Sequence, residues 1–515
     1  MQEPKHSRGR ERRRGGTGLT YASLEQVAAW RFLWHRMAVA VARHSVRLVH
    51  DPSKNYGAAA LVGVVISVLA LGVCFVLAWL RPVGQIGETT KLVADRGSGA
   101  LFVDVNGTMH PVLNLASARL ILGQPDTPKM VPMAQIEKRP IGPMVGIVGA
   151  PNDLTPRTPT ATGWGLCDRA GTPGTQATPR VAALTGLADL GDWAHEMRSP
   201  EAVLMTYGGQ IFLVTDGHRS QLDLADKPVM LALGLQAGGL RPAPMSRALY
   251  EALLPTAPLR VPDVPSPGGP VGYATPTLPV VSGSVLKSHG AGGDDQFFVA
   301  LPAGLQMIPE TVALMLHNAN VSRQGRVLEV TAPVVAAAPQ AVGFDVSMYP
   351  TGPVKLLDKA AEPVTCVLWR KDSGAPQATV TTVSGRRLPI GQGEDRRLIR
   401  LVSAQAGQRS ADEVYLGPQS ANFVQVTGVE PDSGRSESVW WIGPTGVRFG
   451  IETSERQHDP LRALGLSEAE PTPAPWAVVR WLPAGPALSR QSAMVEHDTL
   501  GANPEAAPLS EKGTR

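Results

Sequence analysis

The chain has 515 residues, with 48 Lys and Arg against 44 Asp and Glu and only three Cys. This length can bury sizeable hydrophobic cores, so the fold does not depend on metal ions or on dense disulfides. The 54 Gly and 46 Pro, with aromatic residues at 5%, disfavour a long helical bundle and favour short strands, turns and loops.

The first 55 residues carry the excess positive charge. They hold eleven Lys or Arg against four Asp or Glu, a net charge of +7, whereas the remainder holds 37 against 40, a net charge of −3. Such a split indicates either a nucleic-acid-binding arm or a membrane topology signal.

The basic head, residues 1–55, divides into two parts. Residues 1–18 are rich in Arg and Gly and are predicted to be disordered. Leu24–Leu48 shows the apolar periodicity of an amphipathic helix, with Arg residues between the apolar positions. We interpret this helix either as lying on anionic lipid or as docking onto a cytoplasmic partner.

Residues 56–80 are predicted to form a single transmembrane helix. Tyr56–Leu80 is 25 residues without a charge, and a helix of this length exceeds the ~30 Å hydrocarbon core of a bilayer. The long head argues against a cleaved signal peptide. By the positive-inside rule the head stays in the cytoplasm, and the residues from Arg81 onward are exported. The sequence therefore predicts a single-pass membrane protein in contact with the lipid bilayer.

The cysteines indicate one disulfide. Cys74 lies in the span, which leaves Cys167 and Cys366 in the exported part. A disulfide between them is the simplest interpretation, with two separate thiols as the alternative. The bridge would close a loop of about 200 residues, for which the chain-entropy model gives roughly 5 kcal/mol. Two isolated cysteines supply too few ligands for a metal site.

Four exported segments share one pattern: an apolar strand, a turn with Gly, a second strand and an apolar helix-like run. Asn106-Gly107 and Asp216-Gly217 are strong hairpin turns, and three of the runs end near a Gly, as helix C-caps do. We interpret the segments as hairpin–helix repeat modules, with chance similarity as the alternative. They lie near residues 100–123, 210–235, 296–318 and 439–466.

The remaining exported residues complete the predicted architecture. Strand-like stretches over 326–426 predict a central β core that contains Cys366, and Pro- and Gly-rich connectors run over 151–179 and 255–279. Residues 500–515 are predicted to be a disordered tail. The fold class is therefore α+β and β-rich: a short cytoplasmic helix, one transmembrane helix, and an elongated exported body (81–499) of four modules around a β core.

The sequence contains no signature of chemistry. No Gly is followed by Lys, so the phosphate-binding G-x-x-x-x-G-K-[ST] is absent, as are G-x-S-x-G and H-E-x-x-H. The His residues lack ligand spacing, and the net negative charge of the exported part speaks against nucleic acid as a partner. We therefore assign no catalytic, cofactor-binding or metal-binding residue.

The sequence resembles the EccB family, the single-pass inner-membrane component of type VII (ESX) secretion systems. The resemblance runs from about Leu24 to Leu500. Its most specific stretches are HPVLNLASARLILG at His110, GPMVGIVGAP at Gly142, GWGLCD at Gly163, PMSRALYEALLP at Pro244, ESVWWIGPTGVRFGI at Glu437 and GPALSRQSAMVEHDTL at Gly485.

The resemblance implies a structural subunit of a six-fold membrane complex with EccC, EccD, EccE and further EccB copies, engaged on its periplasmic side by the mycosin protease MycP. It also implies four repeat domains around a β core and a periplasmic disulfide. The overall pattern leans towards the subtype that exports PE and PPE proteins.

Family members are often labelled ATPases, which conflicts with the absence of Walker A and Walker B motifs here. Three functions therefore stay open: an assembly subunit, a nucleotide hydrolase with an unrecognised site, and a cell-envelope-binding module.

Overall fold

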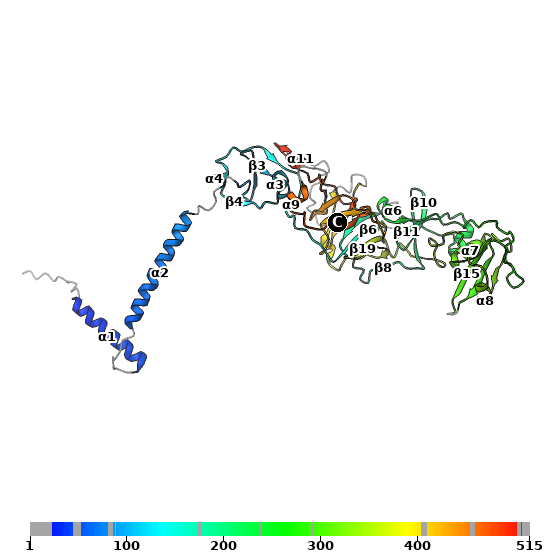
Figure 1. The fold of residues 1–515 in the computed structure, drawn as a ribbon, viewed down its shortest axis with the longest axis horizontal. Coiled ribbons are helices and arrows are strands. Elements are labelled where there is room, and N and C mark those ends of the chain that lie inside the picture. Colours follow the sequence, from blue (N-terminus) through cyan, green and yellow to red (C-terminus); the bar gives the residue numbers. More distant parts are fainter. Residues whose placement is uncertain are drawn as a thin grey trace, which may run out of the picture. The chain divides into compact units, whose positions relative to one another are not determined.

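The computed structural model describes residues 23–44, 53–80, 86–87, 89–171, 178–236, 238–290, 293–402, 409–453, 459–501 and 506. The chain divides into two compact units, Met1–Val83 and Gly84–Arg515 (Figure 1). Residues 1–18 and most of the tail at 500–515, both predicted to be disordered, lie outside the described residues.

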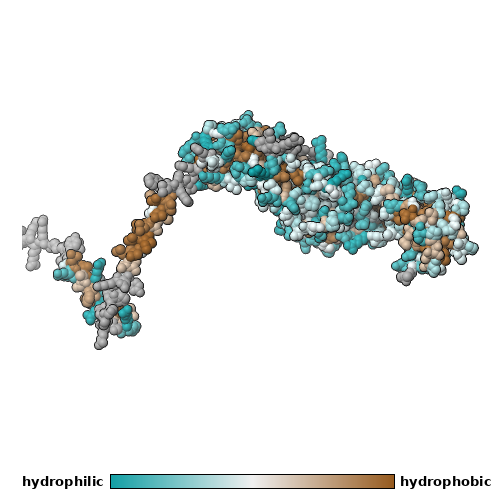
Figure 2. Space-filling view, in the orientation of Figure 1, coloured by the Kyte–Doolittle hydropathy of each residue, from teal (hydrophilic) through white to brown (hydrophobic). Residues whose placement is uncertain are grey.

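The first unit contains the two helices predicted from the sequence. Helix α1 (Leu24–Arg43) begins with a capping box between Ser23 and Gln26 and buries none of its residues. It ends before the predicted Leu48, because His44 takes the left-handed conformation of a C-cap. Helix α2 (Ser53–Leu80) holds the one stretch of the described residues long and apolar enough to cross a membrane, Gly57–Leu77, with a mean hydropathy of 2.9 (Figure 2, brown).

Each predicted module of the second unit contains a hairpin followed by a helix; that the four are repeats of one another stays a prediction. We call them modules 1 to 4. In chain order they are β2 (Leu101–Val105), β3 (Thr108–Val112) and α3 (Leu115–Leu122); β10 (Gln210–Thr215), β11 (His218–Gln221) and α5 (Lys227–Ala232); β15 (Asp295–Leu301), β16 (Gly304–Ile308) and α7 (Glu310–Asn318); and β24 (Val439–Ile442), β25 (Arg448–Gly450) and α9 (Pro460–Leu464).

The local sequence accounts for the hairpin turns of modules 1 and 2 and for the ends of two of the helices. Asn106 and Gly107 both have positive φ, as do Asp216 and Gly217, which is the backbone of the tight hairpin turns that Asn-Gly and Asp-Gly favour. Helices α3 and α9 end at Gly123 and Gly465 in the left-handed conformation.

Further strands extend each hairpin into a sheet. The sheet orders are β27-β5-β3-β2-β1-β4 for module 1, β12-β9-β10-β11-β13 with β18 beside β9 for module 2, β16-β15-β14-β17 for module 3, and β25-β24-β23-β26 for module 4. The added strands are β1 (Leu92–Asp95), β4 (Lys129–Val131), β5 (Met144–Val145), β9 (Glu201–Tyr207), β12 (Ala243–Pro244), β13 (Leu254–Pro255), β14 (Val285–His289), β17 (Val327–Glu329), β18 (Lys355–Leu356), β23 (Phe423–Thr427), β26 (Thr472–Pro475) and β27 (Glu496–His497).

The modules share hydrophobic cores in pairs. One core combines side chains of modules 1 and 4, such as Leu120 and Leu464, and Arg119 of α3 donates a hydrogen bond to the Leu464 carbonyl at 3.2 Å. A second core combines modules 2 and 3, with Val229 of α5 and Val312 of α7. Modules 1 and 4, the first and last along the chain, therefore bury their apolar faces against each other, as do the consecutive modules 2 and 3.

A seven-stranded sheet, β21-β22-β7-β6-β19-β20-β8, forms the centre of the unit. Its strands are β6 (Ala161–Arg169), β7 (Arg180–Thr185), β8 (Ala194–Glu196), β19 (Val364–Asp372), β20 (Thr379–Gly385), β21 (Leu398–Arg400) and β22 (Glu413–Leu416). Short helices complete the unit: α4 (Met133–Ile136), α6 (Arg247–Ala252), α8 (Ala332–Ala337), α10 (Trp476–Val479), α11 (Arg490–Ala493) and the 3-10 helix η1 (Glu394–Arg397).

The extent of this central sheet differs from the β core predicted at 326–426. That range supplies β19 to β22, but β6, β7 and β8 come from residues 161–196, and β6 lies inside a stretch predicted to be a connector. Conversely, β17 and β23 of the predicted range belong to the sheets of modules 3 and 4. The difference arises because strand pairing is set by contacts between distant segments, which local composition does not report.

Candidate functional site

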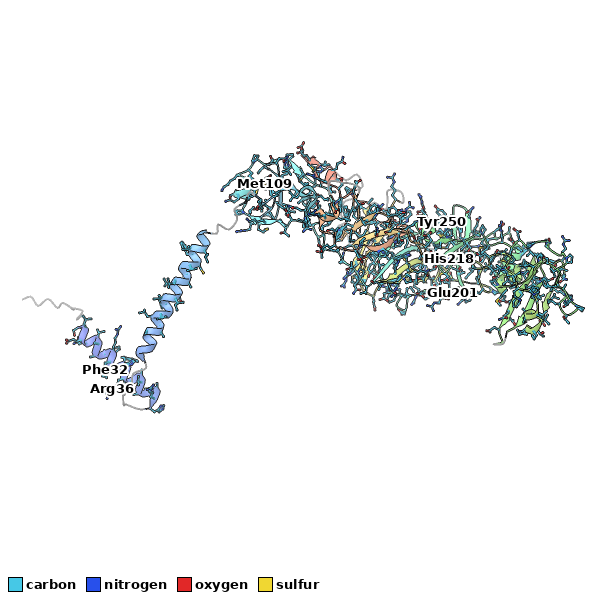
Figure 3. All side chains as sticks on the ribbon, in the orientation of Figure 1. Phe32, Arg36, Met109, Glu201, His218 and Tyr250 are labelled. Atoms are coloured by element: carbon cyan, nitrogen blue, oxygen red, sulfur yellow. A yellow bond between two sulfur atoms is a disulfide. The ribbon has the colours of Figure 1, made fainter. Side chains whose placement is uncertain are left out.

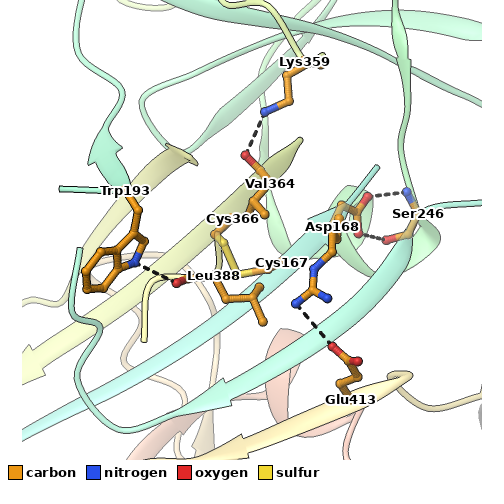
Figure 4. The surroundings of a disulfide bond; sticks show 10 residues. Cys167, Asp168, Trp193, Ser246, Lys359, Val364, Cys366, Leu388 and Glu413 are labelled. Atoms are coloured by element: carbon orange, nitrogen blue, oxygen red, sulfur yellow. Dashed lines mark hydrogen bonds and ion pairs between the residues drawn. A yellow bond between two sulfur atoms is a disulfide. The ribbon is translucent and has the colours of Figure 1, made fainter. Parts of the chain in front are cut away.

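The disulfide joins two adjacent inner strands of the central sheet (Figure 4). Cys167 of β6 and Cys366 of β19 lie directly opposite each other in the antiparallel register, with their Cα atoms 4.0 Å apart. This is the close spacing of a pair that exchanges no backbone hydrogen bonds. Both side chains are buried, and the bond connects positions 199 residues apart. The bridge and the strand ladder therefore fix the same register.

On the disulfide face the sheet packs a small apolar cluster around the bridge. Leu388 and Ile390 cover it from the segment after β20, and Trp193 donates a hydrogen bond from Nε1 to the Leu388 carbonyl at 3.0 Å. Gly163 shares this face, and a Cβ there would lie 2.5 Å from the carbonyl oxygen of Gly186. The absent side chain thus lets the segment after β7 lie against the sheet.

The opposite face belongs to the largest hydrophobic cluster, because side chains alternate along a strand. Trp164 and Leu166 of β6 pack there with residues of β9, β23 and α10. Asp168 is on the same face, and its side chain is buried. A charged group in this position requires polar partners.

Ser246 supplies those partners. Its backbone N–H donates to Asp168 Oδ2 at 2.6 Å, and its hydroxyl donates to Asp168 Oδ1 at 2.6 Å (Figure 4). Ser246 is also the N-cap of α6, since its Oγ accepts from the N–H of Leu249 at 3.0 Å. One serine therefore connects the central sheet to the first turn of α6.

Burial dominates the electrostatics of this site. It raises the pKa of Asp168 to about 7; the Ser246 hydrogen bonds and Lys359 act in the opposite direction, and the charge of Asp412 adds to the rise. Burial also lowers the pKa of Lys359 to about 8, opposed by Glu362 and Asp168. The Lys359 ammonium donates to the Val364 carbonyl at 2.8 Å.

A second buried carboxylate, that of Glu413, also connects strands of the central sheet to one another. Glu413 of β22 lies 3.5 Å from Arg169 and 3.6 Å from Arg400, in each case between side-chain nitrogen and oxygen. The Glu413 side chain is 4% exposed, so the two arginines, rather than solvent, stabilise its negative charge.

This arrangement is a structural joint. Ser246 occupies both carboxylate oxygens of Asp168, and among the described residues no group of three or more His, Cys, Asp or Glu side chains is placed to hold a metal ion. What the site does chemically is to bind strands and helices from distant parts of the chain to one another.

The sequence pointed to the two cysteines, but not to Asp168, Ser246 or Lys359. The usable signal was the Asp that follows Cys167 in an otherwise apolar strand, because a charge in a buried strand must be paired. Ser246, three residues before Leu249 at the start of an apolar run, carried the signature of an N-cap.

Known proteins match this sequence over nearly the whole chain. A family model described as "Type VII secretion system ESX-1, transport TM domain B" matches residues 20–502. The protein named "ESX-5 secretion system ATPase EccB5" from Mycobacterium tuberculosis (strain ATCC 25618 / H37Rv) is 39% identical over 496 residues, which are 95% of this chain and 96% of that protein.

Solved structures match the fold of this chain as well. A chain of the "intact ESX-5 inner membrane complex, Composite C3 model" matches with a TM-score of 0.73 at 37% identity, covering 96% of this chain and 99% of that chain. A chain of the "EccB3 dimer from the ESX-3 core complex" matches with a TM-score of 0.68 at 36% identity, covering 79% and 100% respectively.

Replacing both Cys167 and Cys366 by Ser should destabilise the second unit. We expect the free energy of unfolding to fall by about 2–5 kcal/mol, because the unfolded chain regains the entropy of a long loop. Thermal unfolding of the purified, oxidised full-length protein measures this, with Cys74→Ser, which removes an exposed thiol of α2, as the matched control. Denatured wild-type protein should titrate as one thiol; three reactive thiols would contradict the bridge.

Proposed function

Because this chain belongs to the EccB family of type VII (ESX) secretion systems, we propose that it is a membrane-anchored structural subunit of such a system, which assembles and stabilises the inner-membrane complex and its periplasmic chamber. The observation that carries the proposal is the match, over 96% of this chain and 99% of the other, to a component of an intact ESX-5 inner membrane complex.

The molecule has the parts that this function requires. Helix α2 provides a membrane anchor, and the second unit is held together by paired module cores and by a buried, disulfide-linked central sheet. Such a body suits a scaffold that keeps its shape while it contacts other subunits. As partners we propose EccC, EccD, EccE and the protease MycP, together with further copies of this chain in a six-fold complex, and as substrates PE and PPE proteins.

Assembly can be tested by co-purification. The affinity-tagged chain, extracted from membranes in mild detergent, should elute with EccC, EccD and EccE as one large complex. The variant that lacks residues 24–48 should still insert in the membrane through α2 but lose these partners, if α1 docks onto them. Elution of the wild-type chain as a free monomer would contradict the proposed function, whereas a deletion variant that keeps its partners would contradict only the docking role of α1.

We further propose that the amino terminus is cytoplasmic and that the second unit is periplasmic. The net charge of +7 before the span supports this orientation. In a Cys74→Ser background, a membrane-impermeant maleimide added to intact cells should label Thr499→Cys but not Ser7→Cys. Permeabilised cells provide the control, in which both positions should react; labelling of Ser7→Cys alone in intact cells would reverse the orientation.

ATP hydrolysis is the second candidate function, because the relative from M. tuberculosis is named an ATPase. The sequence lacks a phosphate-binding G-x-x-x-x-G-K-[ST]. We expect no ATP-dependent phosphate release from the purified full-length chain above that of a heat-denatured sample. Activity that follows the protein through a further purification step and is lost on a single substitution would establish the hydrolase instead.

A further inference from the structure

A cavity of about 330 Å³ lies between module 2 and residues 347–354, the segment that precedes β18. Module 2 contributes the start of β9 and the β10–β11 turn, and the segment contributes Tyr349, Pro350 and Thr351. A cavity of this size is large enough to hold a ligand or a side chain of another protein. It is lined by neither the disulfide nor the joint between Asp168 and Ser246, so it is a separate feature of the second unit.

The cavity presents hydrogen-bond acceptors that no described residue satisfies. Asp216, in the β10–β11 turn, lines the cavity, and its carboxylate has no hydrogen-bond or ion-pair partner among the described residues. Glu201 uses its Oε2 for His195 at 3.2 Å, which leaves Oε1 for a ligand. His218 donates from Nδ1 to the Asp216 carbonyl at 2.6 Å, so Nε2 of the neutral ring is a further acceptor. Glu201 and His218 are both labelled in Figure 3.

The charge of the lining indicates the class of ligand. Among the described residues that line the cavity there is no Lys or Arg to offset the carboxylates of Glu201 and Asp216. A complementary group must therefore bring hydrogen-bond donors and positive charge. The guanidinium of arginine has five N–H donors and no acceptor, in a planar fork that matches carboxylates, and it is more weakly hydrated than the ammonium of lysine. The cavity therefore favours an arginine side chain.

A second cavity of about 280 Å³ adjoins the first, because Thr351 lines both. Phe297, Met307 and Ile308 give it an apolar wall, and the Met307 side chain is 56% exposed. In an extended peptide the side chains of residues i and i+2 lie on the same side, about 7 Å apart. One peptide can therefore place two such side chains in adjacent cavities, which a small amine cannot do.

We propose that the two cavities form a docking surface for an extended segment of a partner polypeptide. The segment places an arginine in the first cavity, where Asp216 and Glu201 bind its guanidinium, and an apolar side chain two residues away in the second, where it packs on Met307. Charge complementarity selects this partner, since an acidic segment would meet the two carboxylates with like charge. The surface adds specific recognition of a basic segment to the scaffold function.

Competition against a fluorescent peptide tests the docking surface on the full-length protein in phosphatidylcholine nanodiscs, with empty nanodiscs as the blank. The probe is the blocked peptide Gly-Arg-Ala-Leu-Gly. The competitors are the unlabelled peptide, its analogue with citrulline, which has the shape of arginine without the charge, and propylguanidine, which is the arginine side chain alone. The arginine peptide should bind roughly tenfold more tightly than the citrulline peptide, because only the arginine forms charge-assisted hydrogen bonds.

The wild-type protein alone can contradict the proposal. Equal affinities for the arginine and citrulline peptides, or no measurable binding of the probe, would overturn it. An affinity for propylguanidine equal to that for the arginine peptide would overturn the polypeptide as occupant, because the second cavity would then contribute nothing.

Asp216→Asn removes one carboxylate charge and keeps the turn. Asp216 has a φ of 43°, and Asn106, at the same place in the turn of module 1, has a φ of 53°, so Asn is compatible with this backbone. The affinity for the arginine peptide should fall roughly fivefold. Glu329→Gln, at an exposed carboxylate of β17 outside both cavities, should leave it unchanged. Unchanged binding to Asp216→Asn would overturn the assignment; Glu201→Gln should show the same loss and replaces Asp216→Asn if that variant does not fold.

Met307→Ser tests the second cavity separately. Because Met307 is exposed, its replacement should leave the fold intact. The variant should bind the arginine peptide severalfold more weakly than the wild-type protein, since it loses the apolar contact, and should bind propylguanidine with unchanged affinity. A loss of affinity for both probes, or for neither, would overturn the role of the second cavity.

Discussion

The antiparallel ladder between β6 and β19 is the constraint on which the second unit depends. It pairs Ala161–Arg169 with Val364–Asp372 along their whole length. Because neighbouring residues of a strand face opposite sides, a shift of one residue would exchange the two faces of the sheet. The register that brings Cys167 to Cys366 is therefore the same register that places Asp168 opposite Thr365. By fixing this register, the disulfide stabilises the arrangement of side chains on both faces of the sheet.

Short-range features of the structure could be predicted from the sequence. The turns at Asn106-Gly107 and Asp216-Gly217 depend on residues within four positions of one another, and the uncharged stretch of α2 is visible by composition alone. The central sheet could not be bounded in this way. Residues 161–169 lie among Pro- and Gly-rich sequence, and what makes them a strand is the pairing with β19, about 200 residues later.

The candidate site shows the same division. The number of cysteines is sufficient to pair Cys167 with Cys366, because the sequence of the second unit contains no other cysteine. Asp168 could not be understood from its neighbours, since the group that satisfies it, Ser246, is 78 residues away. The connection that Asp168 makes between the sheet and α6 exists only in the tertiary structure, which this connection helps to stabilise.

The last strand among the described residues, β27, has a consequence for how the protein reaches its folded state. Strand β27 pairs with β5 in the sheet of module 1, and His497 contacts the Gly146 carbonyl at 2.9 Å across 351 positions of sequence. In a chain synthesised from its amino terminus, the residues of module 1 are made first, but its sheet keeps β5 unpaired on one side until Glu496 and His497 have been added. Open edges invite pairing with the wrong segment. Module 1 is therefore begun first and completed last, and its sheet acquires its final strand only when nearly the whole chain has been synthesised.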